Sequence, residues 1–336
     1  MRNSSSLLLS ALLLCAPAPA WAWGSSGHRI IGRVALKGLP SGLPAFLRSK
    51  DAIWQVGELA REPDRWRTAG AGHDAELNTG HFVNMTEDGK IAGVLALSDL
   101  PAMREAYDTA LRAGGSTQYK AGYLPYSIII GFQQLRMDFA YWRADVAGAK
   151  FAKSAQAHAW FTADRKLHEM TALRDLGVWA HFVGDASQPM HVSVHHDGWG
   201  DYPNPENFTA APGIHAKFEA SFVRANVREA QISARLPPLH VCGCKIEDET
   251  KTYLTRALDR LVPLYRLDKQ GAFDGANAAG KDFVTAQLAA GAAELRDLVA
   301  EAWVQSDTIS VGYPAALVKD IEAGHADPLG SLQGLD

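Results

Sequence analysis

Apolar residues recur at intervals of three and four along most of the chain, and this helical period constrains the fold more than any other feature. Pro125–Ala147 is the longest case, with Ile128, Phe132 and Leu135 in its apolar series. Strand signals are few, the one candidate being His81–Met85. The pattern predicts one all-α domain with long functional loops. Helices are expected at Ser26–Leu39, Leu100–Gly114, Pro125–Ala147, Leu167–Val183, Ile214–Val227, Thr250–Asp268 and Lys281–Gln305, and loops at Gly70–Thr79, His195–Gly213 and Leu236–Glu247.

The amino terminus has the pattern of a secretory signal peptide, which would occupy residues 1–22. Arg2 gives a positive start, Leu7–Cys15 is a short apolar run, and Ala20-Trp21-Ala22 fits the signal peptidase. We therefore predict cleavage between Ala22 and Trp23 and an exported protein, secreted or periplasmic. A buried amino-terminal helix is disfavoured because the segment is rich in proline, and lipid attachment at Cys15 is disfavoured by the residue before it.

Charge and composition bound the mature chain. We predict one domain over residues 23–310 and a loose tail over 311–336. The formal net charge of −4 becomes −5 once Arg2 is removed, which argues against a broad basic groove for duplex DNA. A substrate whose phosphate binds to metal ions held by the protein stays possible, because the net charge calculated from the sequence does not include such ions. No later apolar stretch reaches about 18 residues, so a soluble protein is expected. Cys242 and Cys244 could pair or stay reduced.

Histidines and carboxylates recur at helical spacing in two places. His181 and Asp185 are four residues apart and would share one helix face, as two ligands of one ion must. A proline then breaks the helix before His191. His215 and Glu219 repeat the four-residue spacing. Together with His191 they would supply three protein ligands and leave one position open, which is how catalytic zinc is held.

Simpler explanations exist for single histidines, which are usually satisfied surface or core residues, and two such pairs can arise by chance. The Gln-Pro-Met-His run that ends at His191 makes the set more than a matter of spacing. We interpret His195 and His196 as loop residues rather than ligands. The remaining histidines are expected to have no partner at ligand spacing and to be solvated: His73, His158, His168, His240 and His325.

Two runs of this sequence resemble those of a known enzyme family. The run from His181 to His191, His-Phe-Val-Gly-Asp-x-x-Gln-Pro-Met-His, resembles the signature of the zinc-dependent nucleases typified by the fungal S1 and P1 enzymes, which share a fold with bacterial zinc phospholipases C. The run from Trp23 to His28, Trp-Gly-x-x-Gly-His, is similar to the mature start of those nucleases. The resemblance covers roughly residues 23–227. It implies an all-helical fold of the zinc phospholipase C and P1 nuclease type, with three zinc ions per chain.

The resemblance also implies a ligand set. Asp64 lies in Glu-Pro-Asp-Arg-Trp-Arg and His81 in Gly-His-Phe-Val-Asn, and both runs match segments of the family. Trp23 would bind through its free amine and its carbonyl, so export and activation would be linked. The implied groups are Trp23 with His28 for one zinc, Asp64, His81 and His181 for a second, Asp185 bridging these two, and His191, His215 and Glu219 for the third.

The activity implied by the resemblance is hydrolysis of single-stranded DNA or RNA to 5′-phosphorylated products, with 3′-nucleotidase activity as an additional expectation. Asp64, Arg67 and Asp185 would be the catalytic residues. Arg67 would clamp a phosphoryl oxygen, unless it is simply a surface arginine. Phe82 would stack on a nucleobase, unless it only packs. A monomer with no stable protein partner is expected.

Departures from the family pattern keep two other functions open. The nucleases have Asp where this chain has Glu219 and the phospholipases have Glu, and residues 195–204 replace a Gly-Gly-Asn segment. The nucleases' disulfide cysteines are also missing. One alternative is a zinc phospholipase C that takes a phospholipid, which Trp23, His28 and Phe82 disfavour. The other is a non-catalytic zinc-binding protein, which Arg67 beside the ligand set disfavours.

Overall fold

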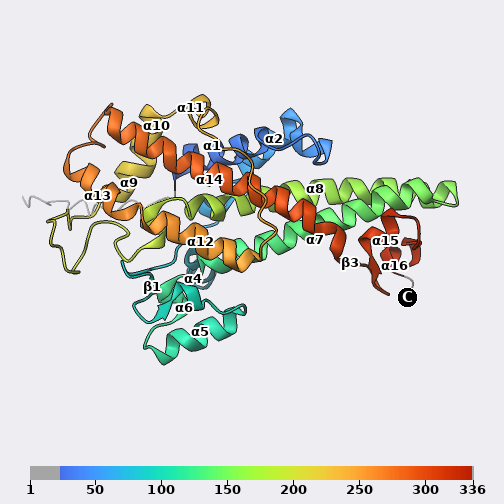
Figure 1. Cartoon of the computed structure of the whole chain (residues 1–336), viewed down its shortest axis with the longest axis horizontal. Helices are drawn as coiled ribbons and strands as arrows, with labels where there is room; N and C mark the ends of the chain where they lie inside the picture. The colour runs from blue at the N-terminus through green and yellow to red at the C-terminus, as the bar shows by residue number, and fades with distance from the viewer. Residues whose placement is uncertain (1–22, 335–336) are drawn as a thin grey trace, which may run out of the picture.

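The computed structural model describes residues 23–334, so the predicted signal peptide lies outside the described residues. The described chain is all-α, as predicted, with only two short β-hairpins (Figure 1). The helices are α1 (Gly24–Lys37), α2 (Lys50–Leu59), α3 (Glu62–Arg65), α4 (Ala71–Asn78), α5 (Arg104–Ala113), α6 (Gln118–Ala121), α7 (Leu124–Phe151), α8 (Ala155–Asp185), α9 (Ile214–Ala216), α10 (Val223–Asn226), α11 (Glu229–Ser233), α12 (Ile246–Leu258), α13 (Leu261–Lys269), α14 (Ala278–Gln305), α15 (Val318–Glu322) and α16 (Leu329–Gln333). Strand β1 (Lys90–Ile91) pairs antiparallel with β2 (Leu95–Ala96), and β3 (Ser310–Val311) with β4 (Ala316–Leu317).

Helices α7 and α8 form a long antiparallel pair that runs from the middle of the molecule to one of its ends (Figure 1). The hydroxyl of Ser154 accepts a hydrogen bond from the Ala157 amide and caps the start of α8. α8 therefore begins twelve residues before the predicted start at Leu167 and ends at Asp185. Its last turns carry His181 and Asp185 into the centre of the fold, where both side chains are fully buried.

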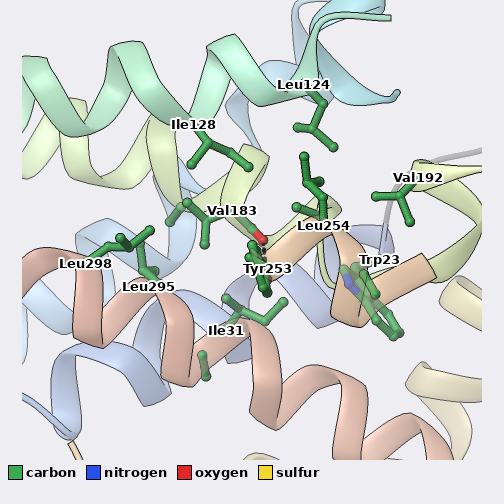
Figure 2. Close-up of a cluster of buried hydrophobic side chains, with 14 of the residues drawn as sticks. Trp23, Ile31, Leu124, Ile128, Val183, Val192, Tyr253, Leu254, Leu295 and Leu298 are labelled. Carbon is green, nitrogen blue, oxygen red and sulfur yellow. Dashed lines mark hydrogen bonds between the residues drawn. The ribbon is translucent and has the colours of Figure 1, made fainter. Parts of the chain in front are cut away.

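Helices α1, α12 and α14 pack around the carboxyl end of α8 and enclose an apolar core (Figure 2). Ile31 of α1, Val183 of α8, Leu254 of α12 and Leu295 of α14 are all buried there. The hydroxyl of Tyr253 donates to the Val183 carbonyl at 2.8 Å, so the last turn of α8 is held to α12. Each such aliphatic side chain contributes roughly 1.5–3 kcal/mol by its burial, and the core therefore fixes the end of α8.

Several predicted boundaries were wrong. Pro263 lacks a backbone N–H, and the predicted helix Thr250–Asp268 is split into α12 and α13 just before it. The predicted loop Gly70–Thr79 contains α4. The predicted strand His81–Met85 is absent: the segment starts in a 3₁₀ turn over Thr79–His81, and its only pairing is a bridge from Met85 to Ile91.

Residues after 310 do not form the loose end that the sequence predicted. Val311, Val318 and Ile321 are buried in a small apolar cluster with Ala140 and Ala144 of α7. Strand β3 and helix α15 bring these apolar residues against α7. The glycine and proline content of the segment gave no indication of this packing. No helix within residues 23–334 is long and apolar enough to cross a membrane.

Candidate metal centre

Residues from six separate segments meet around the carboxyl end of α8. His28 comes from α1, and His181 and Asp185 from the last two turns of α8. The 3₁₀ turn Pro189–Val192 carries His191. The ligand-type atoms form three groups in which all members lie within 4.8 Å of one another: His28, His181 and Asp185; Asp64, His81 and His181; His191, His215 and Glu219.

Asp185 lies between the first two groups. Its Oδ1 is 3.4 Å from His28 Nε2, and its Oδ2 is 3.1 Å from His81 Nδ1 and 3.3 Å from His181 Nε2. The rings of His28 and His181 stack at 3.9 Å. One carboxylate thus turns one oxygen to each group, which is the arrangement that a bridging ligand requires.

The second group is built where α3 and the 3₁₀ turn before Phe82 approach α8. His181 Nε2 lies 2.8 Å from His81 Nδ1 and 3.9 Å from Asp64 Oδ1. Arg67 NH2 is 3.1 Å from the same Asp64 oxygen. Asp64 and His81 are almost fully buried, so the group is shielded from solvent.

The third group depends on an irregular helix. His215 lies in α9, and Glu219 lies in the π-helical turn Lys217–Phe222 that continues it. His215 Nε2 is 2.7 Å from Glu219 Oε2 and 3.1 Å from His191 Nε2. Single π-helical turns occur frequently at functional sites, and sequence spacing alone predicted an ordinary helix here.

Backbone carbonyls fix the orientation of three imidazoles. His181 Nδ1 lies 2.8 Å from the Ala60 carbonyl, His191 Nδ1 2.8 Å from that of His81, and His215 Nδ1 2.5 Å from that of His196. A proton on each Nδ1 leaves the lone pair of Nε2 facing the centre. Metal-binding histidines are commonly held in this way.

The electrostatics of these residues favour bound cations. Burial raises the pKa of Asp185 to about 8 and that of Asp64 to about 6. Burial also holds the pKa values of His81 and His181 below their usual range, so both imidazoles are neutral and able to act as ligands. For His215, burial would lower the pKa, but Glu219 raises it overall.

Trp23 lies against the third group. Its backbone nitrogen is 3.1 Å from Glu219 Oε2, its carbonyl accepts the Gly27 amide at 3.0 Å, and its indole N–H lies 2.8 Å from the Ser187 hydroxyl. The nitrogen therefore reaches the site, and the carbonyl keeps one lone pair for a further contact. The resemblance implied a zinc at Trp23 and His28, whereas the Trp23 nitrogen contacts Glu219, in the third group.

Phe82 follows His81 directly and is half-buried, outside the main apolar core. Gly122 lies so close that an added Cβ would overlap the Phe82 ring and carbonyl.

The loop histidine His195 belongs to none of the three groups. It is buried, its ring stacks on Trp199 at 3.9 Å, and its Nε2 lies 2.9 Å from Glu87 Oε1. Its interpretation as a loop residue fits this position.

Gln188 is a site residue to which the sequence gave no role. Its Nε2 donates to Glu219 Oε2 at 3.1 Å, and its Oε1 accepts the Met190 amide at 2.7 Å. It thus fixes both the glutamate and the turn that carries His191. The sequence could have indicated this role, because Gln188 is the first residue of the Gln-Pro-Met-His run that ends at His191. Cys242 and Cys244, whose pairing the sequence left open, form a disulfide.

The donor set fits zinc. Imidazole nitrogens and carboxylate oxygens are the ligands that zinc takes in catalytic sites, with three protein ligands and an open position. Glu219 Oε1 and His81 Nε2 are buried and have no hydrogen-bond partner among residues 23–334. Such atoms are costly to bury unless something satisfies them, and a cation at the third group would satisfy the Glu219 oxygen.

No protein-family model matches the sequence, and no curated protein sequence does. Among solved structures, the alpha-toxin of Clostridium perfringens from an avian strain matches at 14% sequence identity with a TM-score of 0.40. The match covers 88% of this chain and 69% of that chain. At this level the similarity supports no conclusion about activity, so the site itself must carry one.

Proposed function

We propose that this protein is a zinc-dependent hydrolase of phosphodiester bonds. The observation that carries the proposal is Asp185, a fully buried carboxylate with its two oxygens turned to two adjoining groups of ligand-type residues. A third group lies beside them, with Trp23 against it. Closely spaced ligand groups of this kind suit the handling of a phosphate ester, whose charge is spread over several oxygens.

Zinc ions in these groups would supply Lewis acidity that lowers the pKa of a water and offsets negative charge on the phosphate oxygens. The chain itself supplies positioning. Asp185 contacts residues of the first two groups and so fixes their relative position. Backbone carbonyls fix the orientation of the imidazoles of His181, His191 and His215. Arg67, which lies 3.1 Å from Asp64, can present its guanidinium to a phosphate oxygen as charge builds.

The class of phosphodiester is a finer proposal, and Glu219 is the observation that favours a phospholipid. Its longer side chain reaches both His215 at 2.7 Å and the Trp23 nitrogen at 3.1 Å. Glutamate at this position is the phospholipase feature in the family that the sequence resembles. The geometry of the site therefore gives the phospholipid more support than the sequence did.

A single-stranded nucleic acid is the second candidate, and Phe82 is the observation that favours it. The ring follows the ligand-type residue His81 and is only half-buried, so one part of it can meet a nucleobase. Its close approach to Gly122 limits the freedom of the ring, which leaves stacking as a proposal that an assay must decide.

The test is a parallel assay on the purified, processed protein. A small chromogenic phosphodiester, phosphatidylcholine vesicles and single-stranded DNA are each incubated with zinc and with a chelator. We expect zinc-dependent cleavage of the small diester and of one natural substrate. Arg67→Lys keeps the charge but loses the forked donor set, and we expect it to lower kcat by about 10-fold or more with zinc content unchanged. A zinc-loaded protein inactive on all three substrates would contradict the proposal.

A further inference from the structure

A second cluster of His and acid residues lies on the outer part of the α7–α8 pair. Asp145 of α7 meets Asp164 and His168 of α8. His168 Nε2 is 3.7 Å from Asp164 Oδ2 and 4.0 Å from Asp145 Oδ2. Because a helix rises about 1.5 Å per residue, His168 lies about 20 Å along α8 from His181. The cluster is therefore separate from the metal centre.

The expectation that His168 is solvated and has no partner at ligand spacing was wrong. Asp164 lies four residues earlier, on the same face of α8, and the His168 side chain is 22% exposed. Its ring stacks on Tyr141 with an interplanar angle of 13°. The contact holds the imidazole in place, and burial keeps its pKa below the usual range, so the ring is neutral.

Asp145 is the unusual member of the cluster. Its side chain is completely buried, and neither carboxylate oxygen has a hydrogen-bond partner among residues 23–334. The nearby Asp164 is another acceptor when ionised. An ionised carboxylate in such surroundings is strongly unfavourable unless a cation or a hydrogen-bond donor contacts it.

No lysine or arginine among residues 23–334 forms an ion pair with Asp145. Arg165 is near enough to lower the pKa of Asp145, but its guanidinium pairs with Glu169 at 3.5 Å. Glu169 also accepts the Trp142 indole N–H at 3.1 Å. Within the described chain, the only ion-pair partner of Asp145 is the neutral imidazole of His168.

We propose that Asp145, Asp164 and His168 bind one divalent transition-metal ion, such as zinc, that clamps α7 to α8. Ligand atoms about 2.1 Å from a tetrahedral ion lie about 3.4 Å from one another. His168 lies 3.7 and 4.0 Å from the two carboxylates, and all three ligand atoms lie within 4.8 Å of one another, so small side-chain movements can bring them to this value. One imidazole and two carboxylates form a donor set that zinc and manganese both accept.

A shared proton is the competing way to satisfy this carboxyl. Burial, with Asp164 beside it, raises the pKa of Asp145 to about 8. The two arrangements differ in a measurable way, since an ion needs all three side chains whereas a proton needs only the two acids.

The experiment compares bound zinc in four dialysed full-length proteins by atomic emission. Asp145→Asn keeps the shape of the side chain and removes a ligand charge, and His168→Gln removes the imidazole at a partly exposed position. Asp138→Asn is the matched control, because Asp138 is a buried acid on the same helix that belongs to none of the His and acid groups of residues 23–334. The fourth protein is the wild type.

We expect Asp145→Asn and His168→Gln each to bind one zinc fewer per chain than the wild type, and Asp138→Asn to match it. Zinc should also raise the Tm of the wild type more than that of either variant. The difference does not depend on how many ions the metal centre holds. If both variants retain the wild-type zinc content, the proton explanation holds and the proposal is overturned. Should Asp145→Asn fail to fold, His168→Gln alone decides the question in the same way.

Discussion

The imidazoles of His191 and His215 face each other with their Nε2 atoms 3.1 Å apart, while the Nδ1 of each meets a backbone carbonyl. Two neutral rings held in this way would point lone pairs at each other. The pair is satisfied either by an extra proton, as the raised pKa of His215 beside Glu219 indicates, or by a cation that both rings bind.

Zinc binding should therefore release protons. Asp185, with a pKa raised to about 8, carries a proton at pH 7 that a metal must displace, and the raised pKa of His215 means that its imidazole also holds a proton more tightly than usual. We expect the metal-free protein to release protons on addition of zinc, and its zinc affinity to rise as pH increases from 6 to 8. Calorimetric titration in buffers of different ionisation enthalpy measures both. An affinity independent of pH would show that these groups are not the ligands.

Asp185→Asn should impair two ligand groups at once. The amide keeps the size of the side chain but is a much weaker zinc ligand, and Asp185 contacts His28, His81 and His181. Since even residues that only orient a ligand usually matter 10- to 100-fold, we expect activity to fall on the order of 100-fold or more. Asp138→Asn serves as the control for replacing a buried acid. Near-normal activity in Asp185→Asn would rule out the bridging role.

The start of the mature chain should matter for activity. The Trp23 nitrogen lies 3.1 Å from Glu219 Oε2, and a free amine has a lone pair for a metal whereas a peptide nitrogen does not. We expect a protein with one extra glycine before Trp23 to fold normally and to lose activity by about 10-fold or more. A cleavable extension provides the control, because its removal should restore activity. Full activity in the extended protein would exclude the nitrogen as a ligand.

The packing of α7 against α8 should be sensitive at Gly131. A Cβ there would lie 2.0 Å from the Trp179 ring, whose indole N–H donates to the Ile128 carbonyl at 2.9 Å. Trp179 is two residues before His181, so the strain falls next to the metal centre. We expect Gly131→Ala to lower the free energy of unfolding by about 1–3 kcal/mol. Gly42→Ala, with nothing within 4 Å, is the matched control. Equal denaturation midpoints would contradict the close packing.

Much of the fold and the candidate ligand set was predictable because helical period and four-residue spacing are local properties. His181 with Asp185, and His215 with Glu219, share helix faces, and the structure brings both pairs together with His28, Asp64 and His81. The π-helical turn at Lys217–Phe222 was not predictable, since it depends on what surrounds it. The burial of Asp145 was equally hidden, because only the pairing of α7 with α8 sets it against His168.

Anomalous diffraction from crystals of the processed protein, recorded on both sides of the zinc absorption edge, locates any zinc held by the three groups around Asp185 and Glu219. We expect zinc peaks at all three groups: between His28, His181 and Asp185, between Asp64, His81 and His181, and between His191, His215 and Glu219. Crystals grown with zinc that show no anomalous peak at any of these positions would contradict this expectation.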